Sequence, residues 1–158
     1  MFSPETLELL RVVGAVSAAT RDANKAPSIH RGGAFLVDTD AATARCYIAD
    51  SFVGKLRENA ADNGQIAVTV ANPLDHVTMQ VKGRVQSVAP MTEADIHAAM
   101  DFLQRSGAAF LQGPVFQNLK FTESDLHRWP LFPGIVVTLT IEQVFSQTPG
   151  PGAGARIH

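Results

Sequence analysis

Residues 46–84 carry the patterns of three strands and one short helix, and this segment limits the possible folds more than any other part of the sequence. Hydrophobic and polar residues alternate along residues 65–71 and again along residues 77–88, which is the period of a β-strand. Between residues 52 and 63, Val53, Leu56 and Ala60 fall on one face of a helix. The segment therefore predicts a strand, a tight loop, a short helix and two further strands joined by a turn.

The loop before this helix carries Asp50 and Ser51, and Lys55 lies within the first turns of the helix. Acidic side chains usually occupy a helix N-terminus, because that end carries a partial positive charge. A lysine there has the less favourable charge unless an anion binds beside it, and an ammonium, a hydroxyl and N–H groups together suit a phosphate. The loop indicates a phosphate site; the alternative is an ordinary helix whose lysine is solvated.

Strand patterns also dominate the rest of the chain. We expect a helix over residues 4–11 and strands over residues 12–20, 27–37, 44–49 and 135–145. A second amphipathic helix is predicted to begin at Thr92, with a Thr92–Asp95 capping box, and to end at Gly107. Residues 108–133 are aromatic and irregular, with a short helical turn near residues 122–127. Many antiparallel strands with few helices predict a mainly β fold, an antiparallel split β-barrel with flanking helices.

The strand predicted at residues 77–88 has one unusually polar face. Gly83 in its middle predicts a bulge or a close approach of another backbone. This face must meet solvent, a ligand or another subunit. The alternation places on it Thr78, Gln80, Lys82, Arg84 and Gln86.

Composition excludes several classes of function. The 158 residues are 46% hydrophobic and 18% charged, as is ordinary for one globular domain. A net charge of −2 without a run of Lys or Arg gives no reason to expect nucleic acid as a partner. No apolar stretch approaches the ~20 residues of a membrane span, so we expect a cytoplasmic protein without a membrane partner. The single cysteine, Cys46, excludes an internal disulfide, and the scattered histidines predict no metal site.

Three segments together resemble the pyridoxamine 5'-phosphate oxidase-like, FMN-binding split barrels. They are DANKAPS after the first strand, YIADSFVGKLRENAADNGQIAVTV, and HVTMQVKGRV, and the resemblance covers most of residues 10–145. It implies a homodimer with FMN in a groove between the two barrels. By this reading residues 1–146 form the FMN-binding domain. Residues 147–158 form a Gly/Pro-rich tail that either frays or folds back across the cofactor groove.

The resemblance also implies cofactor-binding residues. Ser51 and Lys55 match the phosphate contacts of the family, and either His30 or Arg31 matches a further basic position near the phosphate. The remaining matches are Tyr47 and Ile48, at a strand end beside the flavin, and Thr78 and Gln80, near the edge of its ring.

Departures from the family pattern bear on the activity. One cation of its phosphate loop is missing, because Phe52, Val53 and Gly54 precede Lys55. The side chains that bind the substrate phosphate in the true oxidases have no counterpart that we can place, so vitamin B6 oxidation is not the expected activity. We expect an FMN-dependent oxidoreductase that acts on a small organic substrate by hydride transfer, with unknown catalytic residues. The alternative is a split-barrel binding, carrier or sensor protein for haem, a deazaflavin or another ligand, without catalysis.

Overall fold

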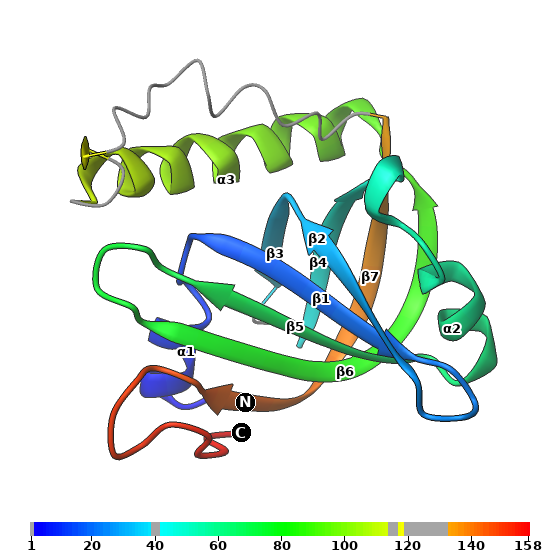
Figure 1. Cartoon of the computed structure of the whole chain (residues 1–158), viewed down its shortest axis with the longest axis horizontal. Coiled ribbons are helices and arrows are strands. Elements are labelled where there is room, and N and C mark those ends of the chain that lie inside the picture. The colour runs from blue at the N-terminus through cyan, green and yellow to red at the C-terminus, as the bar shows by residue number, and fades with distance from the viewer. Residues whose placement is uncertain (1, 39–41, 114–116, 119–132) are drawn as a thin grey trace.

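The computed structural model describes residues 2–38, 42–113, 117–118 and 133–158. In this part of the chain seven antiparallel strands form one sheet in the order β2-β1-β5-β6-β7-β4-β3, with three α-helices and one short 3-10 helix (Figure 1). The predicted split barrel with flanking helices is therefore confirmed. The elements are α1 (Pro4–Leu9), β1 (Ala15–Arg21), β2 (Pro27–Gly32), β3 (Ala34–Asp38), β4 (Thr43–Ala49), η1 (Asp50–Phe52), α2 (Leu56–Asp62), β5 (Gln65–Ala71), β6 (Thr78–Pro90), α3 (Glu93–Gln112) and β7 (Gly134–Ser146).

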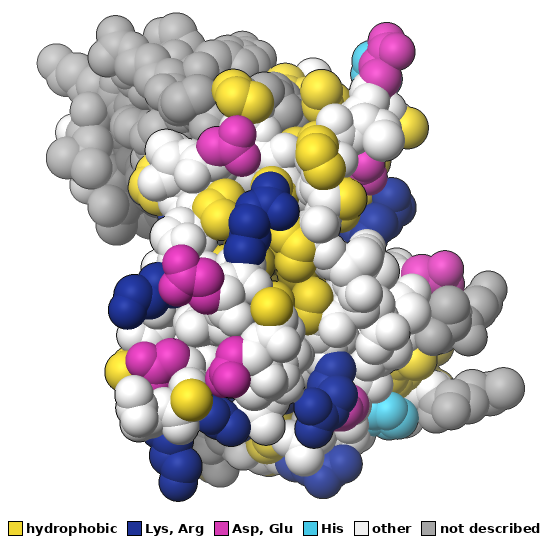
Figure 2. Space-filling view, turned by 90° about the vertical axis from the view of Figure 1, so that its right-hand side faces the viewer, with side chains coloured by type: hydrophobic (Ala, Val, Ile, Leu, Met, Phe, Trp, Pro, Cys, Tyr) yellow, Lys and Arg dark blue, Asp and Glu magenta, His cyan; other side chains and the backbone are white. Residues whose placement is uncertain are grey.

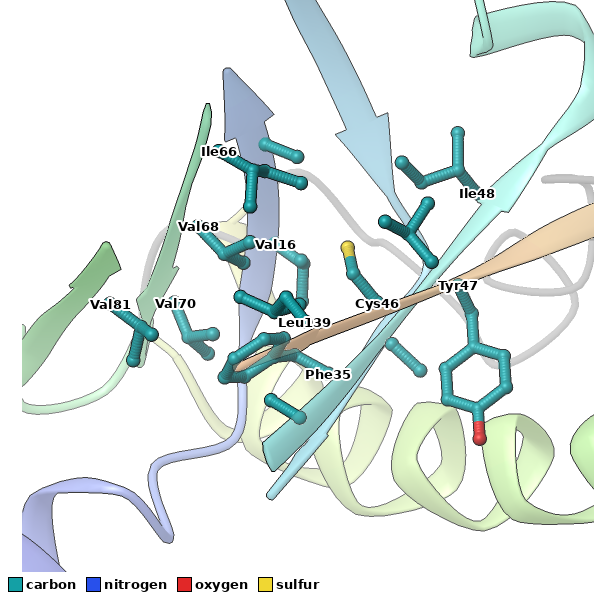
Figure 3. Close-up of a cluster of buried hydrophobic side chains, with 14 of the residues drawn as sticks. Val16, Phe35, Cys46, Tyr47, Ile48, Ile66, Val68, Val70, Val81 and Leu139 are labelled. Atoms are coloured by element: carbon teal, nitrogen blue, oxygen red, sulfur yellow. The ribbon is translucent and has the colours of Figure 1, made fainter. Parts of the chain in front are cut away.

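The inward side chains of these strands form one hydrophobic core. Alternate residues of β5 are buried, and Ile66, Val68 and Val70 face Val16, Phe35 and Leu139 from other strands (Figure 3). Because the alternation has a period of two, the opposite residues of each strand point outward. The predicted faces of the strand at residues 77–88 are confirmed in this way, with Met79 and Val81 buried.

One predicted strand is in fact two. The sequence predicted a single strand over residues 27–37, but β2 ends at Gly32 and β3 begins at Ala34. β2 pairs with β1 and β3 pairs with β4, so the chain crosses at Gly33 from one edge of the sheet to the other. The hydrophobic pattern did not show this break, because Ile29, Phe35 and Val37 are spaced by even numbers as along one strand, although Ile29 is exposed and Phe35 is buried.

The helix predicted at residues 52–63 begins later than expected. A 3-10 turn, η1, comes first, Gly54 follows with a φ of 48°, and α2 begins only at Leu56. A positive φ takes Gly54 out of the helical region, so the chain cannot form one continuous helix from Phe52.

Helix α3 is longer than expected. The capping box is confirmed, because the Thr92 hydroxyl accepts from the Asp95 backbone N–H and the Asp95 carboxylate accepts from that of Thr92. The helix does not end at Gly107, however, but continues to Gln112, and Gly107 is buried within it. Packing of α3 against β3 outweighs the low helix propensity of a single glycine.

Gly83 lies at the predicted irregularity of β6. The register against β7 shifts between Lys82 and Gly83, and a Cβ at Gly83 would overlap the carbonyl oxygen of Thr140. Glycine is needed here because the two backbones approach so closely.

The C-terminal residues 147–158 fold back along β7 and end beside α1 (Figure 1). Ile157 N–H donates to the Val144 carbonyl (2.8 Å), and the Thr78 N–H donates to the Thr148 hydroxyl (3.0 Å). The rings of Phe2 and His158 lie 4.6 Å apart.

The helical turn predicted near residues 122–127 lies outside the described residues. None of the described helices is long and apolar enough to cross a membrane.

Candidate functional site

The turn between β4 and α2, residues 50–55, carries the candidate phosphate ligands. Ser51 and Lys55 are both exposed, and Lys55 occupies the N-cap position of α2, which has no side-chain cap. Within the described chain neither side chain forms a hydrogen bond or an ion pair, and the same is true of Arg57, two residues after Lys55. Two cations and a hydroxyl that have no partner in the part of the chain that the structure describes therefore lie within residues 51–57.

This turn rests on a buried histidine. His30 is 2% exposed, and its ring points inward between β1 and the turn. Its Nδ1 lies 3.2 Å from the Phe52 carbonyl oxygen, and its Nε2 lies 3.0 Å from the Thr20 hydroxyl, which also accepts from the Asn59 side chain (2.8 Å). Burial lowers the pKa of His30, and the carbonyls of Phe52 and Val53 oppose that effect only in part. Both ring nitrogens are thus used inside the protein.

Arg31 occupies the opposite face of β2 and is exposed, as is Ile29 two residues earlier, which is 80% exposed. Of the two alternatives that the sequence left open for the basic position on this strand, Arg31 is therefore the one on the surface. β2 contacts both β4 and η1, so Arg31 belongs to the same end of the molecule as the turn.

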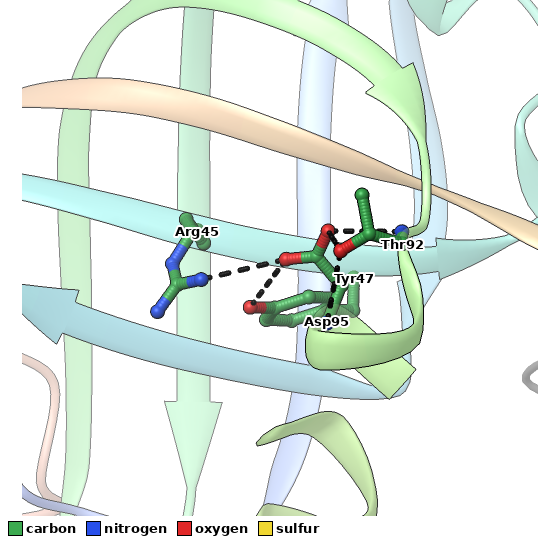
Figure 4. Close-up of polar contacts among 4 residues, drawn as sticks. All are labelled: Arg45, Tyr47, Thr92 and Asp95. Atoms are coloured by element: carbon green, nitrogen blue, oxygen red, sulfur yellow. Dashed lines mark hydrogen bonds and ion pairs between the residues drawn. The ribbon is translucent and has the colours of Figure 1, made fainter. Parts of the chain in front are cut away.

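Tyr47 and Ile48, the predicted strand end beside the flavin, are fully buried. The Tyr47 hydroxyl donates to Oδ1 of Asp95 (3.4 Å), and Arg45 lies 3.4 Å from the same oxygen (Figure 4). Burial raises the pKa of Tyr47 to about 12. Burial alone would raise the pKa of Asp95 too, but the hydrogen bonds from Thr92 and the charge of Arg45 outweigh it and lower that pKa. The Tyr47 side chain therefore anchors α3, and only backbone atoms of β4 remain to face a cofactor.

Thr78 and Gln80 lie on β6, which β5 and β1 separate from β2. The Gln80 amide donates to the Thr69 hydroxyl (3.2 Å), and the Thr78 hydroxyl donates to the His76 carbonyl (2.9 Å). The structure thus brings six of the eight predicted residues to the region of β2, β4 and the turn, but it does not bring Thr78 and Gln80 there.

Sequence reasoning missed three residues of this region, namely Thr20, Asn59 and Arg57. Thr20 and Asn59 are polar residues at inward positions of an amphipathic strand and helix, a signal that could have been noticed. Arg57 lines a hollow of about 260 Å³ together with Asp50 and the apolar residues Met91, Ile96 and Ile135. Figure 2 views the molecule from this side and shows separate basic side chains among hydrophobic and uncharged ones, without a continuous basic patch.

Comparison with protein-family models and with curated proteins finds no match. Solved structures with a similar fold include HupZ of Group A Streptococcus, with a TM-score of 0.55, 19% identity, and coverage of 98% of this chain and 100% of that one. A putative pyridoxamine 5'-phosphate oxidase of Lactobacillus delbrueckii has a TM-score of 0.50 and 20% identity over 91% and 93% of the two chains. An F420 reductase has a TM-score of 0.52 and 16% identity over 87% of this chain and 93% of that one. The chain has the split-barrel fold of these proteins.

Proposed function

We propose that this protein is an FMN-dependent oxidoreductase that acts on a small organic substrate. The observation that carries the proposal is the pair of cations, Lys55 and Arg57, which form no ion pair in the described chain and follow the exposed Ser51 by four and six residues. The chain carries more acidic than basic residues, so two cations two residues apart that form no ion pair within the described chain suit an anion from solution. Ser51 and Lys55 would bind the FMN phosphate, and exposed Arg31 on the adjacent strand would assist.

The chemistry fits the rest of this region. A bound flavin would itself supply hydride transfer, so the protein has to bind and orient the cofactor and does not need a nucleophile or a strong acid. The backbone of β4 at Tyr47 and Ile48 would pass beside the ring. Within the described residues the buried ionisable side chains of this region are those of His30, Cys46, Tyr47 and Asp95.

A homodimer completes the proposed site. Gln80 pairs with Phe145 of β7, whereas Tyr47 pairs with Val136 at the other end of that strand. A second copy would bring Thr78 and Gln80 to the flavin. The exposed Ile29 on the outer face of β2 gives such a contact an apolar centre.

The titration of purified protein with FMN tests the proposal. Lys55→Ala should weaken binding about ten- to hundredfold, because a charge-assisted hydrogen bond is worth about 1.5–3 kcal/mol. Arg11→Ala is the matched control, since Arg11 is another exposed cation without a partner and lies at the end of α1, away from the turn in Figure 1. Equal dissociation constants for wild type and Lys55→Ala would remove the turn from the site.

A second function, the binding of a deazaflavin without FMN, is supported by the similarity in fold to an F420 reductase and by the loss of one loop cation, and haem is the other ligand to be tested. The absorption spectrum of the protein after titration with each cofactor distinguishes these cases. Flavin bands that shift on binding support FMN, whereas saturable binding of only a deazaflavin or only haem supports that ligand instead.

A further inference from the structure

The buried hydrogen bonds around His30 run in one direction. The Phe52 carbonyl can only accept, so Nδ1 of His30 carries the hydrogen. In the neutral ring Nε2 is then an acceptor, and the Thr20 hydroxyl must donate to it. The Thr20 oxygen accepts in turn from the Asn59 amide, which gives a chain of donation from α2 through β1 and β2 to the turn. Both ring nitrogens of His30 have a partner, which fixes both the tautomer and the ring orientation.

The turn also packs on the ring itself. A Cβ built on Gly54 would lie 3.8 Å from Cε1 and Nδ1 of His30, so the backbone at Gly54 lies directly against the imidazole. Gly54 and the Phe52 carbonyl therefore both contact His30, while Val53 of the same turn is buried in the hydrophobic core.

We propose that His30 is a positioning residue, whose Nδ1–H holds the Phe52 carbonyl and so fixes the turn that presents Ser51 and Lys55 to an anion. The inference rests on the proposed function for its ligand, the FMN phosphate, but not for the effect on the turn. His30 is not itself a phosphate ligand here, because both nitrogens are already bonded within the protein.

Two substitutions separate the two bonds of the ring. The Asn side-chain nitrogen is as many bonds from Cα as Nδ1, so His30→Asn keeps a donor for the Phe52 carbonyl and loses the contact with Thr20. The Gln amide is as far from Cα as Nε2, so His30→Gln keeps a partner for Thr20 and loses the bond to the turn. Each variant loses one buried hydrogen bond, so a merely structural role predicts similar effects for both.

Amide hydrogen exchange in the ligand-free protein measures how often the hydrogen bonds of the turn open. The reporters are the N–H groups of Val53, bonded to the Asp50 carbonyl (3.3 Å), and of Leu56, bonded to the Val53 carbonyl (3.0 Å). Exchange at both should be about tenfold faster in His30→Gln and close to wild type in His30→Asn. FMN affinity should fall about three- to tenfold in His30→Gln only. His97→Gln, at an exposed histidine of α3, is the control.

The outcomes separate the inference from the proposed function. Equal exchange in the two variants overturns the positioning role, even if Lys55→Ala still weakens FMN binding. If wild type does not bind FMN but the exchange difference between the variants is present, the proposed function fails and the role of His30 in fixing the turn stands.

A pH series on wild type decides the matter if either variant does not fold. Protonated His30 keeps Nδ1–H on the Phe52 carbonyl and loses only the hydrogen bond that the Thr20 hydroxyl donates. Exchange at Val53 and Leu56, corrected for intrinsic rates, should therefore stay close to its neutral value as the pH falls from about 8 to about 5, as it does in His30→Asn. The other titratable or charged side chains on the surrounding elements are exposed or half-buried, except for Cys46 and Tyr47 of β4, which are buried. They are Arg31 on β2, Arg21 on β1, Asp50 on η1, Lys55, Arg57, Glu58 and Asp62 at or in α2, and Arg45 on β4. Corrected rates at Val53 and Leu56 that rise as His30 becomes protonated overturn the proposal.

Discussion

Among single residues, His30 most clearly joins the fold to the candidate site. It is buried and neutral, and it connects β2 to β1 and to the turn through two hydrogen bonds. A neutral imidazole in such a place makes stability depend on pH, because the unfolded chain protonates the ring more readily than the folded protein does.

The folded protein should lose stability as the pH decreases. The pKa of His30 is 6.5 in the unfolded reference and lower in the folded protein. Between these two values the unfolded state binds more protons, so the free energy of unfolding should fall as the pH decreases from about 6.5 to the folded pKa, and this loss should then level off. Urea unfolding at several pH values measures it. The slope should be smaller in His30→Asn and unchanged in His97→Asn, and an unchanged slope in His30→Asn would contradict the assignment.

Among the elements, α3 shows how one residue serves both a local and a tertiary role. Asp95 completes the capping box with Thr92, and it also accepts from Tyr47 and pairs with Arg45 of β4 (Figure 4). The acid that starts the helix therefore also fixes the helix on the barrel.

We predict that Asp95→Asn destabilises the protein by about 2 kcal/mol, because it weakens a helix cap and removes the charge that Arg45 and Tyr47 contact. Asp101→Asn is the control. Its carboxylate forms only an exposed i,i+4 pair with Arg105, so its loss should cost no more than about 0.5 kcal/mol. Urea unfolding at neutral pH compares the two, and equal losses would show that Asp95 only pairs at the surface.

At the scale of the whole molecule, the proposed site needs a second chain. We predict a homodimer of about twice 16.9 kDa by light scattering at micromolar concentration. Ile29→Asp should yield a folded monomer with weakened FMN binding. It replaces an apolar side chain that is 80% exposed, at the centre of the proposed contact, with a charged one. Leu74→Asp, at another exposed apolar residue in the turn after β5, should remain dimeric. A wild-type monomer at these concentrations would contradict the shared site.

The tail gives a second prediction at this scale. Residues 147–158 bond to Thr78 and Val144 and approach α1, so their deletion should lower the stability by about 1–3 kcal/mol. The FMN dissociation constant should change less than about threefold, because the bonds of the tail to Thr78 involve only backbone atoms of that residue and the tail lies away from the turn beside α2 (Figure 1). Thermal unfolding and flavin titration measure the two effects. Loss of affinity at unchanged stability would instead make the tail part of the site.

Sequence alone determined the features that depend on near neighbours in the chain. The strands of β5, β6 and β7, the capping box of α3 and the irregularity at Gly83 follow from period-two alternation, from a Thr-x-x-Asp spacing and from a glycine within a strand. The exposed turn with Ser51 and Lys55 is equally local.

Only the tertiary structure decided which partner each of these features meets. The break between β2 and β3, the late start of α2 and the continuation of α3 past Gly107 depend on strands and helices distant in sequence. The orientations of His30 and Arg31 also depend on distant elements, because these neighbouring residues point to opposite faces of β2. A shift of one residue along a strand exchanges its faces, and only the packing of β1 and the turn against β2 makes the His30 side inward.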